Sequence, residues 1–249
     1  MLQTKSQAAE KRKNLPLGKS VALVTGGSRG IGRAIALRLA SLGAAVAICG
    51  RDPEALENAR AELAGVGGRV FSKVADVTVQ RDVADLVSAT ETELGPLTIL
   101  VNNAGIGVFG PAHEKSEQDW DRVLNTNLKS VFLLSRAVAP SMIKSGSGDI
   151  VNISSLAGVN AFAGGGLYCA SKWGLQGLSA CMAEDLRKHG IRVSAICPGS
   201  VATEFSGTSV KDPSKVLSAD DVAHAVEMMV TQDAKSFISQ VQIRPLSKP

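Results

Sequence analysis

Residues 21–32 read VALVTGGSRGIG, an apolar run that passes directly into a glycine-rich turn. The run at 21–25 has the composition of a buried strand, and the residues from Gly30 onward have a helical period. Glycine lets the backbone approach a phosphate closely at the N-terminus of a helix, where unpaired N–H groups attract anions. The stretch therefore predicts a strand, a phosphate-binding turn and a helix, which together form the first unit of a dinucleotide-binding sheet.

Short apolar runs alternate with longer segments of helical period through the rest of the chain. Apolar strands separated by helices are typical of a parallel sheet that is covered on both faces. We therefore expect an α/β fold: a single-domain Rossmann-type doubly wound parallel sheet of about seven strands over residues 19–249, after a flexible tail at 1–18. The expected strands are 21–25, 45–49, 70–74, 99–102, 149–153, 192–197 and 238–243, and the expected helices are 30–42, 53–64, 80–94, 119–144, 168–189 and 218–230.

The composition limits the class of protein. The chain has 249 residues, of which 45% are hydrophobic, and its formal net charge is only +4. So small a charge gives no field for nucleic acid, and no apolar run approaches the roughly 18 residues that a membrane span needs. The four cysteines are scattered without metal-like spacing, so we expect free thiols in a reducing compartment. We predict a cytoplasmic protein with no nucleic-acid or membrane partner.

Several residues mark where helices begin and end. Ser218 and Asp221 have the spacing of a capping box, and Gly190 falls just after an expected helix end. Pro140 lies inside the expected helix 119–144, where it removes one N–H donor, so we expect it to kink or shorten that helix.

A tyrosine and a lysine lie four residues apart at the start of an expected helix. Tyr168 and Lys172 therefore share one helix face and can contact the same ligand. A tyrosine has a pKa of about 10, and we expect the neighbouring ammonium to lower it, which makes Tyr168 a usable proton donor. Ser155 follows the expected strand 149–153, at the sheet edge where open α/β folds bind ligands, and Ser154 is the competing hydroxyl.

The motifs follow one order along the chain: T-G-x-x-x-G-x-G at 25–32, N-N-A-G at 102–105, a serine, Y-x-x-x-K at 168–172 and P-G at 198–199. In that order the chain resembles the short-chain dehydrogenase/reductase family over roughly residues 18–246. The resemblance implies an oxidoreductase that interconverts a carbonyl and a secondary alcohol by hydride transfer. The catalytic residues that it implies are Asn127, Ser155, Tyr168 and Lys172.

The family's mechanism assigns a role to each of these four side chains. By resemblance, Ser155 binds the carbonyl oxygen and Tyr168 supplies the proton. Lys172 holds the nicotinamide ribose and tunes Tyr168. Asn127 is expected to hold a water that connects the lysine to solvent, whereas the residue by itself equally suits an asparagine that bends or caps a helix locally.

The end of the second expected strand bears on the choice of cofactor. NAD-selective relatives have an acidic residue there, whereas this chain has Gly50 followed by Arg51. Arg51 and Arg29 both suit bidentate contact with a 2′-phosphate, so we expect NADP(H), although either arginine can be a solvated surface charge and Asp52 is an acid one position later. The residues expected to bind the cofactor are Gly26, Ser28, Arg29, Gly30, Ile31, Gly32, Arg51, Asp76, Val77, Asn103, Ala104, Gly105, Tyr168, Lys172, Pro198, Gly199, Val201 and Thr203.

The sequence restricts the substrate only to a class of small-molecule carbonyls and alcohols. The segment 18–42 is similar to 3-oxoacyl-[acyl-carrier-protein] reductases. The end of the chain, at 243–246, is more like reductases of small ketones or aldehydes, or dehydrogenases of 3-hydroxy acids. Glu184 stands where those carrier-dependent reductases tend to have an arginine, and it would repel an acidic carrier. An NADP-binding sensor or scaffold without turnover is the alternative from another class.

The remaining expectations concern the lid, metals and assembly. The segment between Thr203 and Ser218, which covers the substrate in relatives, is short and mostly polar, so we expect a compact or partly open pocket. The three histidines match no metal-ligand spacing, so no metal is expected. Relatives assemble through the helices expected here at 119–144 and 168–189, which implies a homotetramer or a dimer.

Overall fold

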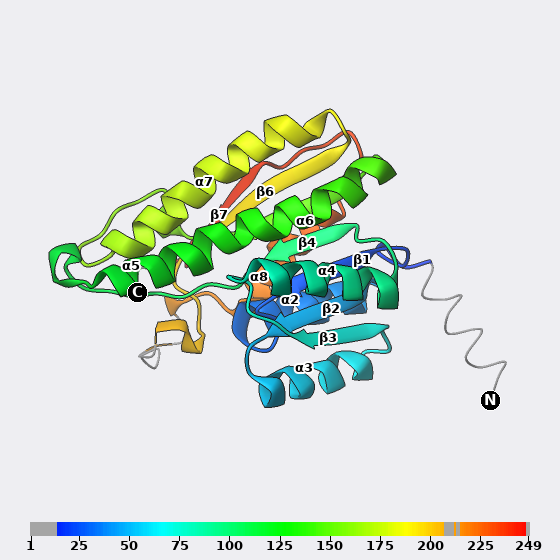
Figure 1. Cartoon of the computed structure of the whole chain (residues 1–249), viewed down its shortest axis with the longest axis horizontal. Coiled ribbons are helices and arrows are strands. Elements are labelled where there is room, and N and C mark those ends of the chain that lie inside the picture. Colours follow the sequence, from blue (N-terminus) through cyan, green and yellow to red (C-terminus); the bar gives the residue numbers. More distant parts are fainter. Residues whose placement is uncertain (1–13, 207–211, 213–214, 248–249) are drawn as a thin grey trace.

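The computed structural model describes residues 14–206, 212 and 215–247, and its centre is one seven-stranded sheet. The strands are β1 (Val21–Thr25), β2 (Ala45–Gly50), β3 (Val70–Val74), β4 (Ile99–Asn102), β5 (Gly148–Ile153), β6 (Ile191–Pro198) and β7 (Gln240–Ile243). All neighbours pair in parallel, in the order β3-β2-β1-β4-β5-β6-β7 (Figure 1). The order reverses between β1 and β4, and in such sheets ligands bind beyond the carboxyl ends of the strands at the reversal.

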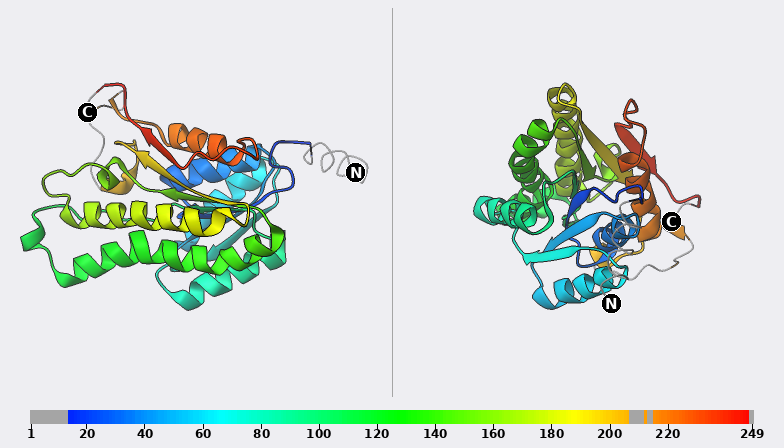
Figure 2. Two further views of the ribbon diagram at one scale, coloured as in Figure 1. Left: turned by 90° about the horizontal axis from the view of Figure 1, so that it is seen from above. Right: turned by 90° about the vertical axis from the view of Figure 1, so that its right-hand side faces the viewer.

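Helices cover both faces of this sheet. They are α2 (Gly30–Ser41), α3 (Pro53–Gly65), α4 (Gln80–Leu94), α5 (Glu117–Leu124), α6 (Ser130–Ser145), α7 (Gly166–Arg187) and α8 (Ala219–Val230), with the short turns η1 (Ala112–Glu114), η2 (Asn125–Lys129), η3 (Leu156–Gly158) and η4 (Glu204–Ser206). Helices α2, α3 and α8 pack on one face, and α4, α6 and α7 pack on the other (Figure 2). The predicted doubly wound α/β fold is confirmed.

Local signals in the sequence located most element ends to within one or two residues. Ser218 accepts a hydrogen bond from the backbone N–H of Asp221, whose carboxylate in turn accepts from the N–H of Ser218, so the capping box at the start of α8 is confirmed. Gly190 follows α7 with a φ of +74°, a left-handed conformation that favours glycine. These contacts satisfy backbone groups that a helix end leaves unpaired.

The continuous helix expected at 119–144 is the main correction to the predicted fold. The segment instead consists of α5, one π-helical turn at η2, and α6. Asn127 within η2 directs its side chain to the backbone of Ile106 and to Ser171, contacts from distant parts of the chain that local sequence patterns do not register. Pro140 does not shorten the helix, because α6 continues to Ser145.

The two ends of the described chain also differ from the expected pattern. Strand β7 begins at Gln240 rather than at 238, because the N–H of Ile238 donates to Oε1 of Gln232 rather than to the ladder. Leu17, assigned by sequence to the tail, is buried and donates its N–H to the carbonyl of Leu42. Residues 1–13 of the expected tail lie outside the described residues.

Three further observations concern the cysteines, membrane-spanning helices and clusters of metal-ligand side chains. All four cysteines are free thiols. Within the described ranges, no helix is both long and apolar enough to cross a membrane. Over the same ranges, no three His, Cys, Asp or Glu side chains gather closely enough to hold a metal ion.

Candidate active site

The glycine turn after β1 has the shape that a phosphate needs. Gly26 and Gly30 have φ values of +64° and +53°, which side chains rarely adopt. A Cβ at Gly32 would collide with the carbonyl of Gly26, and one at Gly30 would lie 3.4 Å from Cγ2 of Thr203. The turn therefore remains open at the N-terminus of α2, where backbone N–H groups attract an anion.

A buried hydroxyl joins this turn to the N-N-A-G segment. Oγ1 of Thr25 accepts hydrogen bonds from the N–H groups of Asn103 and Ala104, both at 3.0 Å. Nδ2 of Asn103 donates to the carbonyl of Thr25 at 2.9 Å. Asn103 thus connects the ends of β1 and β4 on either side of the reversal in strand order.

Asn102 belongs to a separate buried network. Its Nδ2 donates to Oδ1 of Asn152 on β5 at 2.8 Å, and Nδ2 of Asn152 donates to Oγ of Ser179 on α7 at the same distance. Each bond joins two elements of the fold, so the network fixes β4, β5 and α7 beneath the site. Sequence reasoning missed Asn152 and Ser179, because neither belongs to a motif.

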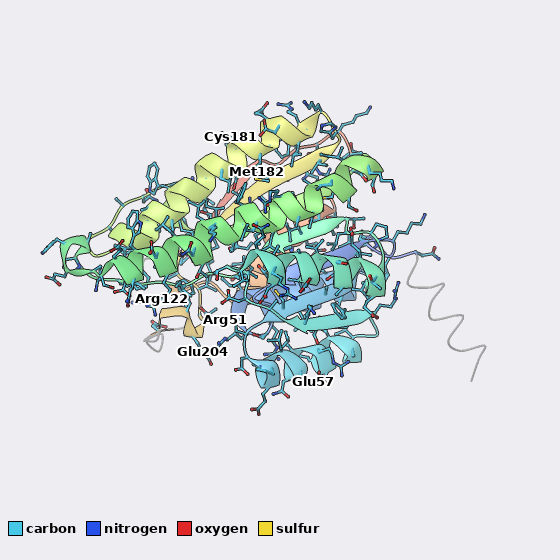
Figure 3. The ribbon with its side chains drawn as sticks, in the orientation of Figure 1. Arg51, Glu57, Arg122, Cys181, Met182 and Glu204 are labelled. Carbon is cyan, nitrogen blue, oxygen red and sulfur yellow. The ribbon has the colours of Figure 1, made fainter. Side chains whose placement is uncertain are left out.

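The end of β2 supplies cationic rather than anionic groups to the cofactor side. Asp52, the acid that favoured NAD, accepts hydrogen bonds from the N–H groups of Glu54 and Ala55 and caps α3. Arg51, labelled in Figure 3, is exposed directly after β2. Arg29 forms an ion pair with Glu204, with 3.6 Å between Nη1 and Oε2. Two arginines therefore follow the carboxyl ends of β1 and β2, and the carboxylate of Asp52 is engaged in capping α3.

The acidic residue after β3 is also partly committed. Oδ1 of Asp76 accepts from both the N–H and the hydroxyl of Thr78, at 2.9 and 2.7 Å. Val77 beside it is buried. The Asp76–Val77 pair therefore forms an ordered turn at the adenine end of the expected site.

Tyr168 and Ser155 meet at the carboxyl ends of the strands. Tyr168 lies in the first turn of α7, and its hydroxyl forms a hydrogen bond with Ser155 at the start of η3. Ser154, the competing hydroxyl, continues the β5 ladder by donating its N–H to the carbonyl of Ile196, and its side chain is buried. The structure therefore pairs Ser155, and not Ser154, with the tyrosine.

Burial has a larger effect on the two titratable groups than their proximity has. It raises the pKa of Tyr168 to about 12, while the hydrogen bond to Ser155 opposes that rise. Burial also lowers the pKa of Lys172 to about 8. The lowered tyrosine pKa that we expected from the lysine is therefore absent in the protein alone, because Nζ of Lys172 is directed to the carbonyl of Ile153 at 2.8 Å.

Asn127 and Lys172 approach each other across Gly105. A Cβ at Gly105 would lie 3.3 Å from Oδ1 of Asn127 and 3.8 Å from Nζ of Lys172. Asn127 donates from Nδ2 to the carbonyl of Ile106 at 2.9 Å and to Oγ of Ser171 at 3.0 Å. Its fully buried amide thus fixes the loop after β4 to α7, beside the lysine.

The P-G segment at the end of β6 packs against the end of β7. Gly199 donates its N–H to the carbonyl of Ile243 at 2.8 Å, and a Cβ on it would lie 2.9 Å from Cδ of Pro245. Val201 forms an isolated parallel bridge with Leu217, which anchors the start and the end of the lid. The lid residues 207–211, including Val210, and 213–214 lie outside the described residues.

Known proteins share this combination of fold and motifs. The profile of the family described as short chain dehydrogenase matches residues 20–214. Gluconate 5-dehydrogenase of Gluconobacter oxydans (strain 621H) is 42% identical over 191 residues, which make up 77% of this chain and 75% of that protein.

Solved structures extend the likeness to the whole sheet. A metagenomic short-chain oxidoreductase in complex with NADP is 42% identical, with a TM-score of 0.83 and coverage of 94% of this chain and 100% of that one. An actinorhodin polyketide ketoreductase with NADPH is 30% identical, with a TM-score of 0.85 and coverage of 91% and 96%. Both complexes hold the cofactor type that the sequence predicted. With the family profile matched over most of its length, the chain belongs to the short-chain dehydrogenase family of NAD(P)-dependent oxidoreductases that act on CH–OH and C=O groups.

Proposed function

We propose that this protein reduces a ketone or aldehyde carbonyl to an alcohol with NADPH, and that Tyr168 donates the proton. The observation that carries the proposal is the buried Tyr168, hydrogen-bonded to Ser155 at the sheet edge with Lys172 one helical turn away. A substrate carbonyl beside these two hydroxyls would receive a hydrogen bond where negative charge develops. Bound NADPH supplies the hydride.

Each catalytic side chain has a distinct part in this proposal. Ser155 orients the carbonyl oxygen, and Tyr168 transfers its proton to that oxygen as the alkoxide charge develops. The hydroxyl of Tyr168 has a pKa raised by burial, so it is fully protonated at neutral pH and ready to donate. Lys172, with its pKa lowered to about 8, holds the ribose while it is charged and lies 5.8 Å from the centroid of the Tyr168 ring.

The proton that Tyr168 loses must be replaced. We assign the positioning of a relay water to Asn127 and to the π-helical turn that carries it. Two features support this assignment: π-helical turns often mark functional sites, and Asn127 lies against Gly105 together with Lys172.

The preference for NADP(H) rests on charge. Arg29 and Arg51 are available to a 2′-phosphate, whereas the carboxylate of Asp52 caps α3. The cradle of Gly26, Gly30 and Gly32 is open to the pyrophosphate. Relatives solved with NADP or NADPH lend support.

The substrate is proposed at the level of a ketone or aldehyde, with a 3-oxoacyl thioester and a 3-hydroxy acid as the alternatives within the family. The polyketide ketoreductase relative supports the thioester. Glu184, which weighed against an acidic carrier, forms an ion pair with Arg187 at 3.0 Å, so its repulsion is partly neutralised. Gluconate 5-dehydrogenase supports a hydroxy acid.

The test is the substrate-dependent loss of NADPH absorbance with wild type and Tyr168→Phe. The panel contains an acetoacetyl thioester, small ketones, aldehydes, diketones and 3-oxo acids. We expect the variant to lose activity by about 10²- to 10⁴-fold while it still binds NADPH, because only the proton donor is removed. Tight NADPH binding by the wild type without turnover of any member would favour the sensor alternative.

We propose a homotetramer, or a dimer, that forms through α6 and α7. A groove between the α5–α6 segment and α7 is lined mainly by apolar residues, among them Phe132, and Phe132 and Trp173 on α7 are both exposed. The four free thiols accord with the proposed cytoplasmic location. Light scattering tests the assembly, and a stable monomer at micromolar concentration would contradict it.

A further inference from the structure

Three phenylalanines from separate loops gather around the catalytic tyrosine. Phe109 lies in the loop after β4, Phe162 lies in the loop before α7, and Phe205 lies on η4. The chain has only six phenylalanines, so half of them meet at this edge of the sheet. We call Phe109, Phe162 and Phe205 the aromatic clamp.

The clamp contacts the reacting residue directly. The ring of Phe109 meets the ring of Tyr168 edge to face, with 5.6 Å between centroids. The centroid of the Phe205 ring lies 5.8 Å from that of the Tyr168 ring. The ring of Phe162 joins the cluster through Phe109, with 6.2 Å between their centroids. The three rings therefore surround the side chain that carries the proposed proton donor.

Glycines leave room for the rings in their present positions. A Cβ at Gly107 would lie 2.6 Å from the Phe109 ring and 3.1 Å from the Phe205 ring. A Cβ at Gly165 would lie 2.6 Å from the ring of Phe162. A side chain at either position would displace a ring, so glycine at both positions allows the three rings to lie where they do.

The clamp also leaves apolar surface uncovered. Phe109, Phe162 and Phe205 are 40%, 50% and 44% exposed, although each already contacts another ring. Their side chains carry no hydrogen-bonding group and no charge. Exposed apolar surface beside a catalytic group is typical of a binding site that a ligand completes.

We propose that the aromatic clamp selects substrates in which an aryl ring is attached to the reacting carbonyl. This inference rests on the proposed function and narrows its ketone class to aryl ketones, or to benzylic alcohols in the reverse direction. A ring in the clamp adopts the edge-to-face contacts that aromatic pairs prefer, and it covers the exposed faces of the three phenylalanines. A polyhydroxylated or charged substrate would gain no hydrogen bond from the clamp and would lose its own to water.

The test compares acetophenone with cyclohexyl methyl ketone, which has a similar shape but a saturated ring. For each ketone, kcat/KM is measured with NADPH in wild type, Phe109→Leu, Phe162→Leu and Phe205→Leu. The readout is the ratio of the two kcat/KM values relative to wild type, which cancels the different intrinsic reactivity of the ketones. We expect that ratio to fall about five- to tenfold in Phe109→Leu, because leucine keeps apolar volume without the aromatic contact.

Phe237→Leu is the matched control. Phe237 is also exposed, but it precedes β7 at the opposite edge of the sheet, so its substitution is expected to leave the ratio unchanged. A ratio unchanged in all three clamp variants would overturn the clamp while leaving the reductase activity in place. A Phe162→Leu variant that altered the oligomeric state in light scattering, but not the ratio, would identify the patch as a subunit contact and would also overturn it.

A binding measurement separates this inference from the proposed reaction. Saturation transfer to acetophenone, observed by NMR with NADP⁺-loaded protein, is expected in wild type and strongly reduced in Phe109→Leu. If no ketone is turned over but this difference persists, the reductase proposal fails and the clamp stands. Equal transfer to acetophenone in both proteins would contradict the clamp, whatever the activity.

Discussion

A charged side chain lies at each end of the strand pair β5 and β6, partly buried at the amino ends and buried at the carboxyl ends, and the two charges are compensated differently. At the amino ends, Asp149 accepts two hydrogen bonds from Arg192, at 2.7 and 3.0 Å, in a bidentate ion pair between the two strands. Beyond the carboxyl ends, Lys172 is almost fully buried, and its Nζ donates to the carbonyl of Ile153. Among the described residues, no carboxylate forms an ion pair with it.

The two ends differ in how the charge is compensated. Burial raises the pKa of Asp149, and the hydrogen bonds from Arg192 oppose that rise, so the charge is retained by pairing. Burial lowers the pKa of Lys172 without a comparable partner, so its charge is easily lost. Groups with strongly shifted pKa values cluster at functional sites, so the contrast supports the proposed site at the carboxyl edge.

The largest change in stability is expected when one partner of the Asp149–Arg192 ion pair at the amino edge is removed. Asp149→Ala leaves the guanidinium of Arg192 unpaired in a largely buried position, and we expect the free energy of unfolding to fall by about 2–4 kcal/mol. Urea unfolding measures this change, and kcat of the remaining folded enzyme should stay close to that of the wild type.

A matched exposed pair provides the control. Glu184→Gln breaks the ion pair with Arg187 on the surface of α7 and is expected to change stability by less than about 1 kcal/mol. If the two substitutions lowered stability equally, the Asp149–Arg192 pair would contribute no more to stability than an exposed ion pair.

At the carboxyl edge, removing the charged side chain is expected to raise stability rather than lower it. Lys172→Met removes a charge that burial destabilises, so we expect stability at neutral pH to rise by about 1–2 kcal/mol while reductase activity is lost. Between pH 8 and 10.5 the unfolded lysine binds a proton and the folded one does not, so wild-type stability should rise with pH in that window relative to the variant. Urea unfolding across the window measures both trends; a variant less stable than wild type at every pH would contradict this account.

The sheet could be predicted because its signals are local. Runs such as 21–25 and 99–102 are apolar throughout and bounded by turn residues, and β1 and β4 have the same limits in the structure. The π-helical turn escaped prediction because its cause is tertiary: Asn127 bonds to Ile106 and Ser171, which lie 21 and 44 residues away in the sequence. Strand β7 began late for a similar reason, a side-chain acceptor on Gln232.

In the candidate site, too, local sequence signals could be predicted and tertiary contacts could not. Residues within compact motifs, such as Tyr168 with Lys172, were found by spacing, because a helix fixes which side chains share a face. Ser155 was preferred to Ser154 only through the family's spacing, and in the structure Ser155 forms a hydrogen bond with Tyr168. The clamp was not predicted, because loops bring its members together from widely separated positions, and the direction of the Tyr168 pKa shift depended on burial that no motif encodes.

The smallest expected effect concerns a second ion pair, at the carboxyl edge. Unlike the pair at Asp149, Arg29 and Glu204 are both exposed, so their attraction is weak and a bound 2′-phosphate can replace the carboxylate. Glu204→Gln should therefore tighten NADPH binding by about two- to threefold and leave NADH binding unchanged, as fluorescence titration of the two cofactors would show. Glu57→Gln, which removes a similar exposed pair with Arg60 on α3, should affect neither cofactor. An equal gain in affinity for NADH and NADPH would mean that Glu204 acts on the lid rather than through Arg29. The carboxyl edge would then lack the exchangeable ion pair that distinguishes it from the fixed pair at the amino edge.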